Sequence, residues 1–259
     1  MPIKAMWIAF LGIFNREVIR VLRIWPQSLL PSAITMTLYF MIFGHVIGSR
    51  VGTMEAMPYM LYITPGLIMM AVIVNSYSNV VSSVFMARYS RSIEEKLVSP
   101  MPNWLIILGY ASGGVFRGVL VGLIVTVISS LFAGLHIQHV MLSIFVLLLS
   151  SFLFCFLGLI NAIFARKFDD TSIITTFIIT PLIYLGGVFY SVSLLPPVWH
   201  VVSLFNPIYY VIKLFRYAML SGSVLAFHLW IPLVIVIVMT LVFFMLCVWL
   251  MNKGVGLKS

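Results

Sequence analysis

Side chains able to do chemistry are few in this sequence, and they gather at the predicted edges of a membrane. Only six carboxylates occur in 259 residues, and all of them fall outside the predicted membrane spans. The sequence contains no G-x-x-x-x-G-K-[ST] phosphate-binding loop, no H-E-x-x-H zinc motif and no G-x-S-x-G nucleophile motif. We therefore predict that the chain is not an enzyme, and that any ATP it depends on is bound by a partner.

The same residues argue against ion-driven transport and metal binding. A carrier coupled to protons or sodium normally places carboxylates within the membrane, and none is predicted there. His136 and His139 could share a helical face, but two ligands without a third make a poor metal site. We predict that this chain itself binds no metal and no other cofactor.

The most polar stretch, residues 88–102, reads RYSRSIEEKLVSPMP. Ser92 and Glu95 fit a capping box at the start of a helix, and Pro100 and Pro102 would end that helix. The pattern predicts a short charged helix between two membrane spans, on the cytoplasmic side.

One face of this helix is expected to be apolar, because Tyr89, Ile93 and Leu97 recur every four residues. Such a ridge suits a groove on a partner protein, and an ordinary solvated loop is the alternative. The charged residues beside the ridge are Arg91, Glu94, Glu95 and Lys96.

Residues 1–25 predict an amphipathic helix that lies along the membrane surface. This segment is not expected to be a cleaved signal peptide, because its charges follow the apolar stretch. It could simply anchor the first span, or it could also act as a lever that touches a cytoplasmic partner. The apolar positions are Trp7, Leu11, Phe14, Val18, Val21 and Trp25, and Arg16, Arg20 and Arg23 form the opposite stripe.

The composition requires that lipid surrounds most of the chain. Of its residues, 63% are hydrophobic and 8% are charged, too few charges to cover the surface of a water-soluble domain. Long intervals between charged residues predict an all-α polytopic protein, a single permease domain over residues 1–259. The six expected spans lie near residues 28–48, 59–84, 106–133, 140–163, 171–190 and 229–251.

The basic residues predict the orientation of these spans. Loops rich in Lys and Arg stay in the cytoplasm, so both termini are expected there. Only Arg50, Lys213 and Arg216 fall on the other side. The net charge of +9 arises at membrane edges, so we predict no nucleic-acid partner. The expected cytoplasmic residues are Lys4, Arg16, Arg20, Arg23, Arg88, Arg91, Lys96, Arg166, Lys167, Lys253 and Lys258.

The predicted outer segment, residues 190–222, is too apolar for water and too short for two more crossings. Pro196, Pro197 and Pro207 divide it into short pieces, which predicts re-entrant helices that cap a pore from outside.

Polar or aromatic residues within spans are the candidates for a pore wall, since lipid-facing positions gain nothing from them. Bonding within the chain is the alternative for Ser and Thr, and snorkelling is the alternative for Arg117. The candidates are Tyr39, Phe43, Asn75, Ser78, Asn79, Arg117, Thr175, Thr176 and Thr180. A separate glycine stripe predicts close helix packing through G-x-x-x-G pairs; it comprises Gly109, Gly113, Gly114, Gly118 and Gly122.

Two motifs carry a resemblance to a known family. The IEEKLVSPMP run at residues 93–102 resembles the coupling segment of type-2 ABC exporter permeases. The runs LPPVWH at 195–200 and NPIYY at 206–210, followed by Arg216, resemble the outer re-entrant segment of the same family. The resemblance covers nearly the entire chain.

The resemblance implies a bacterial inner-membrane permease in which two copies form the path and two separate ATPase subunits bind ATP and Mg. It implies a drug, lipid or polysaccharide as the exported substrate, so a hydrophobic, lipid-linked or saccharide cargo is expected. It assigns Arg16, Glu17, Arg20 and Arg23 to a connecting helix, Arg91, Glu94, Glu95, Lys96, Leu97 and Pro100 to ATPase coupling, and Pro196, Pro197, Trp199, Asn206 and Pro207 to an outer gate.

Three alternatives remain open at this point. An ATP-independent channel or secondary carrier conflicts with the acid-free spans and the 93–102 segment. A membrane-embedded lipid-processing enzyme needs a nucleophile or metal cluster that the sequence lacks. A passive assembly factor is excluded by no sequence feature.

Overall fold

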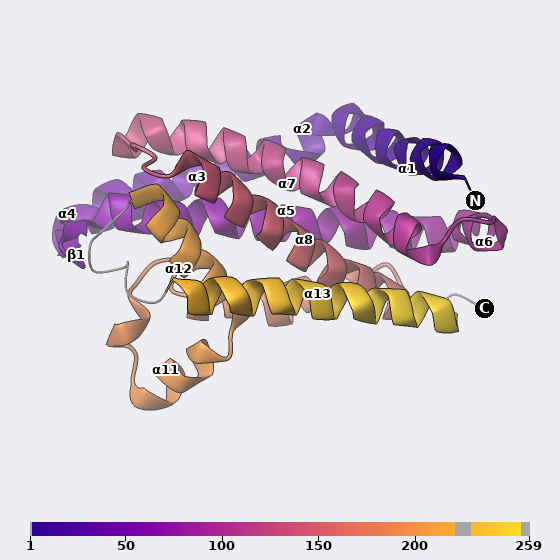
Figure 1. The fold of residues 1–259 in the computed structure, drawn as a ribbon. Helices are drawn as coiled ribbons and strands as arrows, with labels where there is room; N and C mark the ends of the chain where they lie inside the picture. The colour runs from indigo at the N-terminus through magenta and orange to yellow at the C-terminus, as the bar shows by residue number, and fades with distance from the viewer. Residues whose placement is uncertain (1, 221–228, 255–259) are drawn as a thin grey trace.

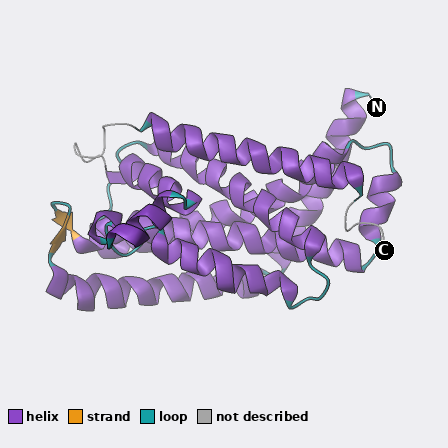
Figure 2. Cartoon of the chain, turned by 90° about the horizontal axis from the view of Figure 1, so that it is seen from below, coloured by secondary structure: helices purple, strands orange, loops and turns teal. Residues whose placement is uncertain are grey.

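The computed structural model describes residues 2–220 and 229–254, and helices account for most of them (Figure 1). Both termini and the short helix α6 (Ser92–Val98) lie at one end of the bundle, which we call the terminal end. The hairpin of β1 (Thr53–Met54) and β2 (Met57–Pro58) lies at the opposite, distal end (Figure 2). Residues 221–228, which include the last part of the predicted outer segment, and Lys258 lie outside the described residues.

The described part of the chain contains five helices that are long and apolar enough to cross a membrane. A sixth is possible if α11 (Pro197–Leu204) and α12 (Pro207–Leu220), which are bent by 82°, form one broken span. This confirms an all-α polytopic membrane protein. The five helices are Trp25–Val51, α5 (Tyr59–Tyr89), α7 (Asn103–Ala133), α8 (Val140–Phe164) and α13 (Trp230–Lys253).

The segment expected to span over residues 171–190 forms a shorter helix, Asp170–Leu185, which is not among the five. It ends at Gly186 and Gly187, and the positive φ of Gly187, 79°, turns the chain away. Its pieces are α9 (Asp170–Ile174), the π-helix η2 (Thr175–Ile179) and α10 (Thr180–Leu185).

The first span is also composite. Pro26 and Pro31 each lie in the first turn of a helical piece, where a missing N–H costs nothing. The pieces are α2 (Trp25–Ser28), α3 (Leu30–Tyr39), the π-helix η1 (Phe40–Ile47) and α4 (Gly48–Val51). The α1 helix (Ile3–Arg23) precedes them and is amphipathic, as its spacing predicts.

The α5 helix forms the centre of the bundle, between α7, α8 and α12. In the most apolar stretch of α5, 78% of the residues are buried. Apolar and small residues occur on all of its sides, the pattern of a helix surrounded by other helices.

The glycine stripe of α7 packs closely, as predicted. A side chain at Gly109 would meet Ile13 of α1, and one at Gly122 would meet Val72 of α5 and Leu147 of α8. The stripe therefore lets α1, α5 and α8 all approach α7.

The distal connections follow the breaks expected from the sequence. Gly134 adopts φ 58° and ends α7. The prolines at 197 and 207 begin α11 and α12, and the 3-10 turn η3 (Val192–Leu194) precedes them. The backbone N–H of His139 donates to the carbonyl of Ala218, which ties the α7–α8 connection to the end of α12.

Candidate functional site

The α6 helix differs in two ways from the sequence expectation. No Ser92–Glu95 capping box forms: Arg91 is the N-cap residue, in a left-handed conformation with φ 56°, and no side chain caps the helix. The predicted apolar ridge is also wrong, because Ile93 is buried in the protein's own core and Tyr89 belongs to the end of α5. Helical spacing identified an apolar face, but that face packs against the parent chain.

The inner face of α6 is fastened to the bundle. Ile93 lies among Val84, Ile106 and Leu159, which come from α5, α7 and α8. The ammonium of Lys96 donates to the hydroxyl of Tyr110 on α7, and burial lowers the pKa of Lys96 below its ordinary value. The α6 helix is therefore attached to the ends of three long helices.

The outer face of α6 is free among the described residues. Glu95, Val98 and Pro100 are exposed, as is Arg91 at the turn before the helix. Glu94 and Leu97 are half-buried. A charged surface with one exposed apolar residue is thus presented at the terminal end.

The predicted connecting helix, α1, turns some of its charges inward. Glu17 is 2% exposed, and its carboxylate pairs with Arg20 at 2.9 Å and accepts a hydrogen bond from Ser83 at 2.6 Å. Arg20 also donates to the side-chain oxygen of Asn79 at 3.0 Å. Of the four residues assigned to the connecting helix, Arg16 and Arg23 are exposed, while Arg20 is half-buried and departs from the expected stripe of surface cations.

A second polar group lies between α3, α5 and α7. The guanidinium of Arg117 donates to the side-chain oxygen of Asn75 at 3.0 Å and to the carbonyl of Ser28 at 3.2 Å. The amide of Asn75 donates to the hydroxyl of Ser32. Asn75, Asn79 and Arg117, three of the pore-wall candidates, are therefore hydrogen-bonded within the chain.

The other pore-wall candidates lie elsewhere. Tyr39 packs edge-on and Phe43 packs tilted against Phe189, in an aromatic cluster that also contains Tyr184. Thr176 is exposed, while the remaining candidates are half-buried: Ser78, Thr175 and Thr180, of which Thr180 bonds the carbonyl of Thr175 at 2.9 Å.

The residues expected at an outer gate divide into two sets. Asn206 is buried, and its side-chain oxygen accepts a hydrogen bond from the backbone N–H of Ile208 at 3.0 Å, which fixes the start of α12. Pro207 follows it. Exposed residues form the second set, at and before the start of α11: Pro196, Pro197 and Trp199.

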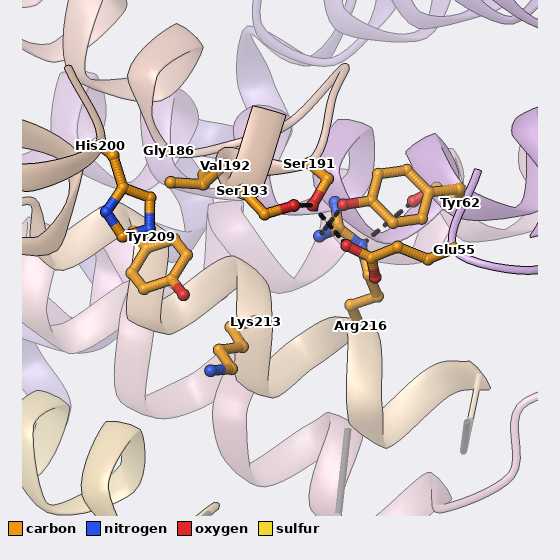
Figure 3. A pocket seen from close by; sticks show the side chains of 10 residues that line it. All are labelled: Glu55, Tyr62, Gly186, Ser191, Val192, Ser193, His200, Tyr209, Lys213 and Arg216. Carbon is orange, nitrogen blue, oxygen red and sulfur yellow. Dashed lines mark hydrogen bonds between the residues drawn. The ribbon is translucent and has the colours of Figure 1, made fainter. Parts of the chain in front are cut away.

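A polar pocket at the distal end was not predicted from the sequence (Figure 3). Arg216 of α12 donates to the carbonyls of Tyr62 at 3.2 Å and Gly187 at 2.8 Å, and to the hydroxyl of Tyr62 at 3.0 Å. The carboxylate of Glu55, in the turn between β1 and β2, accepts a hydrogen bond from Ser191. The sequence indicated this site only through Arg216, an arginine inside an apolar segment. Its spacing did not show which residues would contact it.

The histidines do not form a metal site in the part of the chain that the structure describes, where no three His, Cys, Asp or Glu side chains converge. His139 stacks on Tyr217 instead.

Comparison with known proteins fits this architecture. Residues 8–220 match the family described as ABC-2 type transporter. The chain belongs to the ABC-2 type transporter family. This confirms the resemblance to type-2 ABC permeases, and it makes the chain a transport permease and not an enzyme.

Named relatives of this ABC-2 permease include one of nearly equal length. The permease is 48% identical over 257 residues, 98% of each chain, to the inner membrane transport permease YadH of Escherichia coli (strain K12). It is 25% identical over 189 residues to nodulation protein J of Sinorhizobium fredii (strain NBRC 101917 / NGR234), covering 72% of each chain.

Proposed function

We propose that this ABC-2 permease is the membrane subunit of an ATP-driven exporter in a bacterial inner membrane. Two copies would form the path, and two separate ATPase subunits would bind ATP and Mg beneath them. The name of the YadH relative supports the inner-membrane location. Basic residues at the terminal end, such as Arg91, Lys96 and Lys253, support a cytoplasmic position for both termini.

The observation that carries this proposal is the attachment of α6. Its inner face is held by Ile93 and Lys96, while Arg91 and Glu95 remain exposed. A helix attached to α5, α7 and α8 would transmit a displacement of its docked partner directly into those spans. The exposed charges would give the partner a complementary surface.

The coupling role of α6 is tested with a double charge reversal, Glu94→Arg with Glu95→Arg. We expect the variant to insert in the membrane but to lose its copurifying ATPase and the ATPase-dependent transport, because two attractive contacts become repulsive. Asp169→Arg is the matched control, since Asp169 is also an exposed carboxylate beyond a membrane helix at the terminal end. Unchanged association and transport in the double variant would refute the coupling role.

We propose that the path between the two copies is lined by α3, η1 and the Asp170–Leu185 helix. These segments carry Tyr39 and Phe43, together with the threonines at 175, 176 and 180. Support comes from the low burial of the first span. In its most apolar stretch, only 17% of the residues are buried in the single chain. The hydrogen bonds of Asn75, Asn79 and Arg117 favour a structural role for those three.

Cysteine cross-linking tests this arrangement. In a background of Cys155→Ser and Cys247→Ser, which removes both native thiols, Thr176→Cys is expected to form an intermolecular disulfide within the membrane. Met141→Cys is the control, because Met141 is also accessible, at 83% exposure, but lies on α8. A disulfide for Met141→Cys and none for Thr176→Cys would place the interface elsewhere.

An amphiphilic cargo, hydrophobic, lipid-linked or saccharide, fits the proposed path. Aromatic faces stack on sugar rings and acyl chains alike, and the Tyr39–Phe43–Phe189 cluster provides such faces. We also propose that α11 and α12 enter from the outer face without crossing. Trp199→Cys labelled only from the periplasm would support that topology.

A further inference from the structure

The distal pocket is built from five separate parts of the chain. It has a volume of about 230 Å³, below the roughly 300–1,000 Å³ of pockets that enclose drug-sized molecules. The space suits a headgroup-sized polar group better than a whole lipid or sugar chain. Its polar lining residues are Glu55, Tyr62, Ser191, Ser193, His200, Tyr209, Lys213 and Arg216.

The charges of this lining do not balance. Lys213 and Arg216 are two cations, and Glu55 is the single carboxylate. The guanidinium of Arg216 meets the carbonyls of Tyr62 and Gly187 and stacks over the Tyr62 ring at 3.9 Å. All of these partners are neutral. The carboxylate of Glu55 acts on Arg216 only from beyond ion-pair distance, so the buried positive charge faces the pocket without an ion pair among the described residues.

The donors and acceptors are also divided in space. Figure 3 shows Glu55, Ser191 and Ser193 together on the side of Arg216, while His200, Tyr209 and Lys213 lie on the other side. Lys213 lies 5.7 Å from the ring centre of Tyr209 and makes no ion pair with any described residue. Donors with no anionic partner therefore line the His200–Lys213 side.

We propose that this pocket binds a phosphate-bearing group, with the phosphate on Lys213 and His200 and within the field of Arg216. A neutral sugar would leave the excess positive charge uncompensated, and a cation would be repelled by it. A phosphate supplies both a negative charge and several acceptor oxygens to Lys and His donors. Glu55, Ser191 and Ser193 would form hydrogen bonds with hydroxyl groups of the alcohol that is esterified to that phosphate.

This site goes beyond the proposed function and does not depend on it, because no ATPase or transport step is needed for binding. The phosphate could belong to a phospholipid headgroup at the membrane surface or to a soluble phosphate ester. Both sources offer the same chemistry to Lys213.

The experiment is a binding titration on the purified full-length permease in detergent, without ATPase, at pH 7. One arm uses inorganic phosphate, the second uses dihexanoyl phosphatidylglycerol, and uncharged dihexanoyl glycerol is the reference ligand. Lys213→Gln is expected to weaken binding by roughly tenfold or more, the usual effect of losing one charge-assisted hydrogen bond. Glu55→Gln is expected to tighten binding of inorganic phosphate a few-fold, because the only carboxylate of the lining is gone and this probe has no headgroup hydroxyl for Glu55 to hold.

Lys253→Gln is the matched control, since Lys253 also lies over an aromatic ring, that of Trp249, but at the terminal end. Binding in both charged arms points to recognition of the phosphate itself, and binding of the lipid alone identifies a headgroup. The proposal is overturned if neither charged probe binds, if dihexanoyl glycerol binds as well as the lipid, or if Lys213→Gln and Lys253→Gln have equal effects.

Discussion

Two polar clusters lie toward opposite ends of α5, and they treat positive charge in opposite ways. The α1 cluster consists of Glu17, Arg20, Asn79 and Ser83. In it, Arg20 pairs with the buried carboxylate of Glu17 at 2.9 Å. The distal cluster consists of Arg216, Tyr62 and Gly187 beside the distal pocket. In it, Arg216 is held by carbonyl groups and an aromatic face, with no carboxylate paired to it among the described residues.

The difference separates a structural contact from a ligand site. A charge matched by an opposite charge inside the protein has little left to offer a ligand, whereas a positive charge held by neutral dipoles still attracts an anion. Arg117 is also held by neutral groups, but Arg216 in addition lines a polar pocket. A cation without a paired carboxylate indicates a ligand site only where such a pocket lies beside it.

The largest expected effect is at Glu17. Glu17→Gln leaves Arg20 without its anion and weakens the acceptor of Ser83, so we expect a loss of about 3 kcal/mol in the free energy of unfolding. Denaturant unfolding of the purified protein in detergent measures this loss. The control Glu95→Gln changes an exposed carboxylate of α6. A loss below about 1 kcal/mol would show that the α1 cluster is not a structural lock.

A second effect tests the close approach of α1 and α7 beside this cluster. A methyl group at Gly113 would overlap Cβ of Glu17 and lie 2.9 Å from its Cγ, so Gly113→Ala is expected to cost about 2 kcal/mol. A methyl group at Gly12 would meet nothing within 4 Å, and Gly12→Ala is expected to stabilise α1 by about 0.5–1 kcal/mol. Equal shifts in unfolding temperature for both variants would contradict the packing argument.

Arg216→Met is expected to cost only about 1 kcal/mol, because it leaves neutral carbonyls unpaired and removes the desolvated charge altogether. The same unfolding assay applies. A loss as large as that of Glu17→Gln would erase the contrast between the two clusters.

The smallest effect concerns a carboxylate outside both clusters. The backbone N–H groups of Lys167 and Arg166 donate to Asp170 and hold its pKa below the ordinary value of 3.8. This contribution to stability is present above that ordinary value and is lost as the pH falls through the lowered pKa. Asp170→Asn should therefore lose less stability than the wild type on acidification below pH 3.8, and Asp169→Asn, which removes no side-chain cap bond, should follow the wild type.

Much of the helical framework could be predicted from the sequence. The intervals without charge indicated the long helices, Pro197 and Pro207 marked the start of two short ones, and the glycine spacing of α7 indicated where helices approach. These features depend on local chemistry, which a sequence displays directly.

The direction in which a helix faces could not be predicted. In a membrane both lipid and protein accept apolar side chains, so the periodicity of α6 identified an apolar face without showing that Ile93 would pack inward. The pairing of Arg216 with Tyr62 joins residues 154 positions apart, and the Glu17–Ser83 contact joins residues 66 apart. Neither pair leaves a trace in local spacing.

The π-helical turns of η1 and η2 have a geometric consequence for the helices that contain them. A π turn holds an extra residue relative to an α turn, so its conversion to α geometry rotates the remainder of the helix by roughly 100°. Tyr39 lies immediately before η1, Phe43 lies within it, and Thr175 begins η2. Conversion of either segment to α geometry would therefore change which of its side chains face the proposed path.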